Sequence, residues 1–512
     1  MDSDGIRRPR TVVAMWSALV LAGVLCSLPA GSQTKDPLLF PKDRFTVKQR
    51  TVHTSAGERK VTYRAYLHIP YVALPVDKEY QSLNVYAPVS VDGVEVDPMH
   101  APILFSIGVG GYMACSVTRQ EMDRSTRSAA PPPAGAPQAR EGVRPKVSNV
   151  ELALAAGYVV ITVACRGRDN RAADGTYYGK APAAIVDLKA AVRYLRHNQG
   201  IVPGNTEWIV STGVSAGGAL SALLGASGDS PLYEPYLQEI GAAKGEDRIF
   251  ASACYCPITD IEHADGAYEW MYGATPRSGG RVDQTLSREL RALYTSYQSS
   301  LGLQGRNGFG LLTAENYDRY LLHEYLIPSA ERYLRALSEA DRRSYLAKNT
   351  WIDWNEYGPV FSFRDYVAHV GRMKGVPAFD DLAMSQPEPI LFGTRTVNAR
   401  HYTDFSLRHA TGSLAGIDPA LQKLVEMMNA MTFIRGKHSG CVHSWWLRQG
   451  SSDNHTSQTV MANLAVSLEN QGKAVDAWLY WDGGHGANED GEQFMAWIGE
   501  ITGHGKGHHP GR

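Results

Sequence analysis

The chain has 512 residues, 44% hydrophobic and 20% charged, which is the composition of a globular protein long enough for one large domain with an insertion. Lysine and arginine total 51 against 52 aspartate and glutamate residues, and the charges form no local runs. This balance excludes a strong field of either sign, so we expect no nucleic acid or other polyanion as a partner.

The N-terminus has the layout of an export signal. A basic leader precedes eighteen uncharged residues, TVVAMWSALVLAGVLCSL, and the small residues Ala30 and Ser32 follow at the spacing of a cleavage site. We predict a signal peptide at residues 1–32, a secreted or periplasmic protein, and no stable membrane insertion after cleavage. A single membrane anchor is the alternative, because eighteen apolar residues can just span a bilayer, but no basic stop-transfer cluster follows.

Short strands and helices then alternate, beginning with two segments rich in β-branched and aromatic residues that indicate an antiparallel start. The predicted strands lie at residues 44–54, 60–72, 83–88, 101–108, 158–167, 207–213 and 249–260, and the predicted helices at 182–198 and 215–227. Such alternation predicts an α/β fold with a parallel sheet. A Pro/Ala-rich stretch, residues 125–142, is predicted to be an exposed loop.

The alternation breaks after residue 260, where Tyr, Leu, Arg and Glu recur at the spacing of amphipathic helices. It returns near residue 445 with strand, helix, strand and a last helix near 489–501. The predicted segments are a signal peptide (1–32), a first core segment (33–260), a helical insertion (261–428), a second core segment (429–503) and a disordered tail (504–512).

Five cysteines follow the leader, and an odd number is not a fully paired disulfide scaffold. Cys254 and Cys256 lack a second pair at zinc-ligand spacing, so we interpret these two as small buried core residues.

The stretch VSTGVSAGG contains Gly213-Val-Ser215-Ala-Gly217, which fits G-x-S-x-G and lies between a predicted strand and a predicted helix. In that context the serine sits on a tight turn with its hydroxyl exposed at the carboxyl edge of the sheet. A serine nucleophile needs a histidine base oriented by a carboxylate. Asp453 and His485 each follow a late predicted strand, in the order Ser, Asp, His of an α/β-hydrolase.

Acyl transfer also requires N–H donors for the oxyanion. The amide of Ala216 is one candidate, and Gly110 and Gly111, in a glycine loop after an early strand, are the others. This chemistry needs no cofactor and no metal.

Beyond this general pattern, the chain resembles the subtype B bacterial tannases, which hydrolyse galloyl esters. The stretches that carry the resemblance are SLNVYAP, IGVGGYM, ACRGRDN, GTYYGKAPAAIVDLKAAVRYLRHN, EWIVSTGVSAGGALSALLGASG, VPAFDDLAMSQPEPILFG and NARHYTDFSL. The resemblance implies an α/β-hydrolase core with a large lid at residues 261–428, and a triad of Ser215, Asp453 and His485. It also implies that Lys374 and Glu388 hold the gallate hydroxyls.

One position departs from the family. The family carries a second aspartate two residues after the catalytic one, and here that position is His455. A histidine donates or accepts one hydrogen bond and cannot replace a carboxylate that accepts two, so the preferred phenolic ring can differ.

We therefore predict a serine esterase whose partners are small-molecule phenolic esters, namely galloyl or related hydroxybenzoyl esters. A broader carboxylesterase or feruloyl-type esterase is the nearest alternative. A prolyl-oligopeptidase-type peptidase would carry β-propeller repeats, which the sequence lacks. A non-catalytic binding protein that kept the fold is the alternative from another class.

Overall fold

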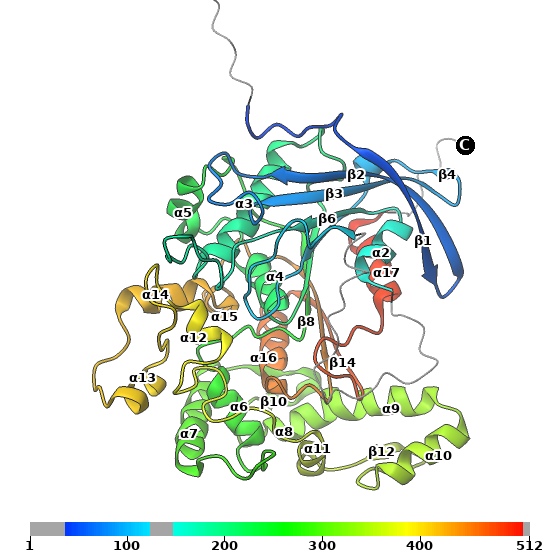
Figure 1. Ribbon diagram of the computed structural model, residues 1–512. Coiled ribbons are helices and arrows are strands. Elements are labelled where there is room, and N and C mark those ends of the chain that lie inside the picture. Colours follow the sequence, from blue (N-terminus) through cyan, green and yellow to red (C-terminus); the bar gives the residue numbers. More distant parts are fainter. Residues whose placement is uncertain (1–35, 123–146, 505–512) are drawn as a thin grey trace, which may run out of the picture. The chain divides into compact units, whose positions relative to one another are not determined.

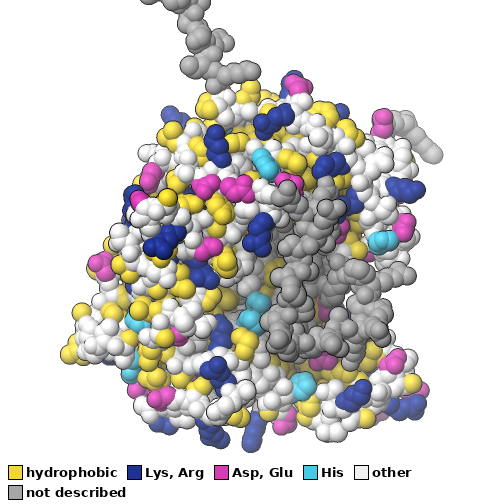
Figure 2. All heavy atoms as spheres, viewed as in Figure 1, with side chains coloured by type: hydrophobic (Ala, Val, Ile, Leu, Met, Phe, Trp, Pro, Cys, Tyr) yellow, Lys and Arg dark blue, Asp and Glu magenta, His cyan; other side chains and the backbone are white. Residues whose placement is uncertain are grey.

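The computed structural model describes residues 36–122 and 147–504, and the chain divides into a short N-terminal unit, Met1–Pro37, and a unit from Leu38 onward. The predicted signal peptide, the loop at 125–142 and residues 505–512 of the predicted tail lie outside the described residues. Within the described ranges, no helix is both long enough and apolar enough to cross a membrane. On the face drawn in Figure 2, basic and acidic side chains are interspersed.

A ten-stranded sheet organises the unit that begins at Leu38 (Figure 1). Its order is β1-β2-β3-β6-β5-β7-β8-β13-β14, with β4 beside β3. The strands are β1 Thr46–Thr54, β2 Gly57–Pro70, β3 Ser82–Val91, β4 Val94–Glu95, β5 Ile103–Ile107, β6 Val159–Val163, β7 Ile209–Val214, β8 Ala251–Tyr255, β13 Ser444–Gly450 and β14 Ala474–Tyr480. Pairing is antiparallel from β1 to β6 and parallel from β6 to β14, which confirms the predicted α/β fold with a mostly parallel sheet.

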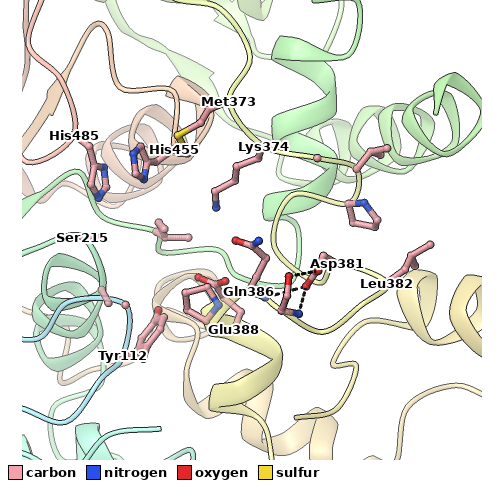
Figure 3. A pocket seen from close by; sticks show the side chains of 18 of the residues that line it. Tyr112, Ser215, Met373, Lys374, Asp381, Leu382, Gln386, Glu388, His455 and His485 are labelled. Carbon is pink, nitrogen blue, oxygen red and sulfur yellow. Dashed lines mark hydrogen bonds between the residues drawn. The ribbon is translucent and has the colours of Figure 1, made fainter. Parts of the chain in front are cut away.

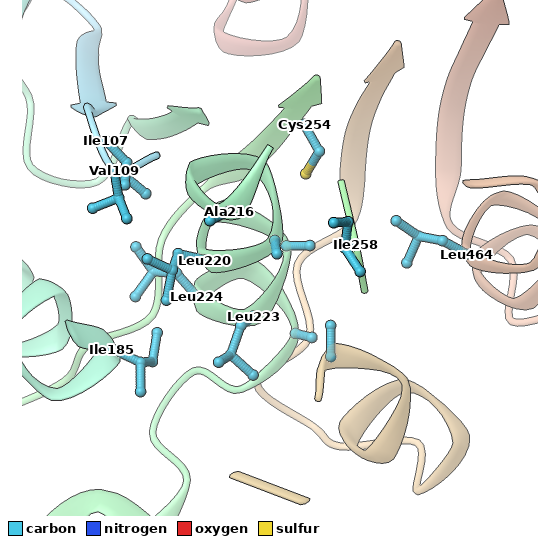
Figure 4. Packing of buried hydrophobic residues seen from close by; sticks show 14 of the residues in the cluster. Ile107, Val109, Ile185, Ala216, Leu220, Leu223, Leu224, Cys254, Ile258 and Leu464 are labelled. Atoms are coloured by element: carbon cyan, nitrogen blue, oxygen red, sulfur yellow. The ribbon is translucent and has the colours of Figure 1, made fainter. Parts of the chain in front are cut away.

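Helices cover both faces of the sheet because the parallel strands are apolar on both sides. In β5, Ile103, Phe105 and Ile107 belong to one buried cluster and Leu104 to the other. The first cluster includes α3 (Ala183–His197), α4 (Ala216–Ala226) and α16 (Gln458–Glu469), and the second α2 (Asn149–Ala155) and α17 (Gly491–Thr502). Figure 4 shows the apolar side chains around α4, the helix that follows the G-x-S-x-G turn.

The insertion between β8 and β13 is mainly helical. It contains α6 Ala264–Tyr272, α7 Gln284–Ser300, α8 Tyr317–Leu321, a π-helix at Leu322–Leu326, α9 Ile327–Ala336, α10 Glu339–Lys348, α11 Phe363–Val370, α12 Pro387–Leu391, α13 Asp404–Thr411 and α14 Pro419–Met427. Two small hairpins were not expected, because strands of two or three residues are too short to show a period of two. They are β9 (Gln304–Gly305) with β10 (Gly310–Leu311), and β11 (Asp353–Asn355) with β12 (Gly358–Val360). Two further short helices are α5 Glu234–Glu239, which precedes β8, and α15 Ala430–Arg435, which precedes β13.

Helix α9 of the insertion packs on β14, the last strand of the sheet. The hydroxyl of Ser329 donates to the carbonyl of Leu479 at 2.6 Å, and the guanidinium of Arg332 lies 3.3 Å from the ring centre of Trp478. Insertion and sheet also share one buried apolar cluster, so the insertion is part of the same packed unit as the core.

Candidate active site

Ser215 lies on the turn between β7 and α4 with φ of 59° and ψ of −123°, a left-handed conformation that a non-glycine residue adopts only under constraint. Its amide donates to the carbonyl of Tyr255 at 3.0 Å. A Cβ on Gly213 would stand 2.3 Å from the carbonyl oxygen of Gly217, and one on Gly217 would stand 2.8 Å from that of Ile107. Both flanking glycines are therefore required for this turn to form against the sheet.

Asp453 and His485 lie at the carboxyl ends of β13 and β14, the edge of the sheet where Ser215 also lies. The carboxylate of Asp453 is fully buried, and both of its oxygens lie 3.1 Å from His485 Nδ1. Ser215 and His485 line one cavity of about 740 Å³ (Figure 3). The structure thus brings the three predicted catalytic residues together around one space that can hold a substrate.

The electrostatic environment of His485 includes a residue that sequence analysis missed. Burial lowers the pKa of His485, but the hydrogen-bonded carboxylate of Asp453 and the nearby thiol of Cys256 outweigh burial and raise it. All five described cysteines are buried and free, and the Sγ of Cys256 lies within 4.8 Å of a carboxylate oxygen of Asp453 and of a ring nitrogen of His485. In the sequence, the one feature that could have indicated this contact is the position of Cys256 directly after β8, at the carboxyl edge of the sheet.

Two of the three predicted oxyanion donors line the cavity, Gly111 and Ala216, whereas Gly110 is not among the lining residues. Ala216 is the first residue of α4, whose initial amides have no acceptor within the helix. The carbonyl of Gly111 accepts from Arg168 Nε at 2.7 Å, and that of Tyr112 from the Arg168 amide at 2.9 Å. Arg168 therefore fixes the glycine loop.

Lys374 and Glu388 reach the same cavity from the insertion (Figure 3). Lys374 Nζ lies 3.5 Å from the ring centre of Phe379. Glu388, the second residue of α12, is buried, and its Oε2 has no hydrogen-bond partner among the described residues. Burial lowers the pKa of Lys374 and raises that of Glu388, while each group's charge partly offsets the effect on the other. Among the described residues, Glu388 Oε2 is thus a buried acceptor without a polar partner, on a side chain that lines the cavity.

Helix α6 fixes the segment that carries Lys374. Arg372 and Glu269 form a fully buried ion pair, with Nη1 to Oε2 at 2.8 Å. Arg372 Nε also donates to the carbonyl of Lys374 at 2.8 Å. The hydroxyl of Tyr268 accepts from the amides of Met373 and Lys374 at 3.2 and 3.0 Å. Lys374 is therefore positioned by side-chain bonds, since its segment has no regular secondary structure.

The segment between Lys374 and Glu388 is held by two buried carboxylates. Asp265 of α6 accepts from the amides of Phe379 and Asp380 at 2.7 and 3.1 Å. Asp380 in turn accepts from His401 Nδ1 at 2.8 Å and from the Thr403 amide at 2.9 Å. Burial and the charge of Asp380 raise the pKa of Asp265 to about 7. Arg277, Asp381 and Gln386 also line the cavity, and sequence analysis did not identify them.

His455 lines the cavity two residues beyond Asp453. Its amide donates to Asp453 Oδ1 at 3.0 Å, and its ring is stacked on that of His485. Sequence analysis gave no signal for this stack, because the two residues lie on different loops.

Comparisons with known proteins agree with this geometry. The family model described as BD-FAE matches residues 138–272. Esterase LipQ of Mycobacterium tuberculosis (strain ATCC 25618 / H37Rv) is 33% identical over 90 residues, 18% of this chain and 20% of that protein, and Esterase LipC of the same strain is 31% identical over 102 residues, 20% of this chain and 22% of that protein. The chain thus matches about a fifth of the length of these curated relatives.

Solved structures match over nearly the full length. A tannase from Fusobacterium nucleatum is 34% identical, with a TM-score of 0.76, over 91% of this chain and 99% of that chain. A tannin acyl hydrolase from Lactobacillus plantarum is 33% identical, with the same TM-score and the same coverage of both chains. Taken with the shared α/β architecture, these matches show that the chain belongs to the bacterial tannase (tannin acyl hydrolase) family of ester hydrolases.

Proposed function

We propose that the protein is a serine esterase that cleaves esters of hydroxybenzoic acids. The observation that carries this proposal is the convergence of Ser215, on its strained turn, with the buried Asp453–His485 pair at one cavity. The unpartnered Oε2 of Glu388 in the same cavity supports the choice of acyl group.

Ser215 Oγ attacks the ester carbonyl while His485 accepts its proton. Asp453, hydrogen-bonded to His485 Nδ1, orients the ring and stabilises the imidazolium. The amides of Ala216 and Gly111 stabilise the negative oxygen of the tetrahedral intermediate. His485 then protonates the leaving alcohol, and a water activated by the same histidine releases the acid.

A ring that carries hydroxyl groups matches the part of the cavity that Lys374 and Glu388 line. A phenolic hydroxyl accepts from the Lys374 ammonium and donates to Glu388 Oε2, which meets the needs of both groups at once. Two solved tannin acyl hydrolases hold ethyl gallate and 3,4-dihydroxybenzoate, each at 33% identity to this chain over 91% of its length. We therefore propose galloyl and dihydroxybenzoyl esters as substrates, with His455 facing the ring where the family has a carboxylate.

Measurement of kcat and KM on a panel of esters tests the proposal. Wild type should hydrolyse propyl gallate and ethyl protocatechuate faster than methyl ferulate, and Ser215→Ala should lose all measurable turnover. Ser296→Ala, an exposed serine on α7, is the matched control and should leave turnover unchanged. A Ser215→Ala protein with near wild-type turnover would refute the nucleophile, and a preference for ferulate would replace the tannase-like function with a feruloyl-type one.

We also propose export, since residues 1–32 retain the features of a signal peptide. Mass spectrometry of the protein from the periplasm or the medium should give a mass without these residues. An intact N-terminus in the membrane fraction would favour the anchor instead.

A further inference from the structure

We infer that His455 is a positioning residue, which holds the ring plane of His485 so that the base faces Ser215 whatever the acyl group. This inference rests on the proposed function only in taking His485 as the base. It gives His455 a role beyond contact with the phenolic ring.

The two imidazoles form a parallel stack, with ring centres 4.0 Å apart and planes inclined by 6° (Figure 3). His485 needs this support because it lies between Gly484 and Gly486, and Gly486 has φ of +78°. Its hydrogen bond to Asp453 involves Nδ1 alone, so this bond by itself would still let the ring plane rotate about the line from Nδ1 to the carboxylate. A flat neighbour on one face of the ring removes that rotation.

The backbone of the loop that carries His455 is itself held by hydrogen bonds. The amide of His455 is bonded to the same Asp453 carboxylate that orients His485. The preceding residue, Asn454, accepts from the Tyr268 hydroxyl at 3.0 Å and donates to the carbonyl of Gly371 at 3.3 Å. The support thus belongs to a loop that the insertion fixes, whereas the base belongs to a glycine-rich loop.

The charged groups that face His455 are His485, Asp453 and Lys374. Burial and the charges of His485 and Lys374 lower the pKa of His455, against the opposing effect of Asp453. The ring of His455 is therefore neutral when His485 carries the proton, and the imidazolium formed in the reaction faces a neutral aromatic surface, which stabilises it. An aspartate at this position would offer no such surface.

The labelling rate of Ser215 by a fluorophosphonate tests this role, because labelling requires the base but no recognition of a phenolic ring. We expect His455→Ala to slow labelling, and the hydrolysis of p-nitrophenyl acetate, by about tenfold or more through misorientation of the base. His455→Phe, which keeps a flat ring, should restore both rates to within about threefold of wild type. His369→Ala, at an exposed histidine whose ring lies against that of Trp351, is the matched control and should change neither rate.

A pH profile of labelling adds a second readout. His455→Asp places a negative charge beside His485, raises the pKa of the base and moves the acid limb to higher pH, whereas His455→Phe leaves the limb in place. Melting temperatures check folding, and His455→Leu replaces the alanine variant if the latter does not fold.

The inference fails if His455→Ala labels at the wild-type rate while losing only hydroxybenzoyl esters, or if His455→Phe is as slow as His455→Ala. Failure of the proposed substrate class has another signature, because wild type would then label at Ser215 but not cleave hydroxybenzoyl esters. If wild type does not label at Ser215, both the proposed function and this inference are wrong.

Discussion

The sheet and the insertion place their site residues by different physical means. In the sheet, Ser215, Asp453 and His485 each follow a parallel strand, so the ladder of backbone hydrogen bonds brings the three together. In the insertion, Lys374 precedes a segment without regular structure, and it is fixed by the Arg372–Glu269 ion pair and by Tyr268.

This difference separates two properties of the enzyme. In the proposed function, the reaction depends on backbone topology, which tolerates many side-chain changes. The proposed choice of acyl group depends on a few buried polar contacts that hold Lys374 and the segment leading to Glu388. We expect substitutions in the two regions to affect different kinetic constants.

The largest effect is expected in the sheet. Asp453→Asn keeps the shape of the side chain but removes the charge that stabilises protonated His485, so kcat should fall by about 10³- to 10⁴-fold. KM for propyl gallate should change little, which steady-state kinetics will show. Asp476→Asn, at a half-exposed carboxylate on β14, is the control. A similar loss of kcat in this variant would show that the effect is not specific to Asp453.

In the insertion, Arg372→Leu leaves Glu269 buried without a partner and should lower the free energy of unfolding by about 3–5 kcal/mol. Denaturant titration measures this loss. The exposed pair Arg343–Glu339 provides the control, and Arg343→Leu should cost at most about 0.5 kcal/mol. Where the folded enzyme can be assayed, KM should rise for propyl gallate and not for p-nitrophenyl acetate.

Glu388→Gln should act on the acyl group alone. An amide cannot accept in the same way as the buried Oε2, so kcat/KM for propyl gallate should fall by about 10- to 100-fold. Activity on p-nitrophenyl acetate should stay within a factor of two or so, since that ester carries no phenolic acyl ring. An equal loss on both esters would place Glu388 in the reaction itself.

The smallest effect concerns pH. The pKa of His485 is raised above its ordinary value of 6.5, and the base must be neutral to accept a proton from Ser215. Activity should therefore increase as pH rises through the pKa, with the half-maximum of kcat/KM above pH 6.5. A profile already flat at pH 6 would show that Asp453 and Cys256 do not raise the pKa during turnover.

The contrast between the regions also explains what could be predicted from sequence. The three predicted catalytic residues follow strands that alternate with helices, and this alternation can be recognised in the sequence without knowledge of tertiary contacts. Lys374 and Glu388 have no such pattern, and only the resemblance to a family suggested them. The contact of Cys256 with His485 and the His455–His485 stack depend on which loops meet at the carboxyl edge of the sheet. The order of the strands determines which loops meet, and local periodicity in the sequence does not reveal that order.

The packing of α9 on β14 gives the insertion a structural role in addition to its placement of Lys374 and Glu388. β14 is the terminal strand of the sheet, with one strand neighbour, and His485 follows directly from it. An uncovered edge strand offers unpaired backbone groups to other chains and readily seeds aggregation. Shortening the enzyme by deleting the insertion should therefore yield a chain that self-associates, with His485, the proposed base, following its least supported strand.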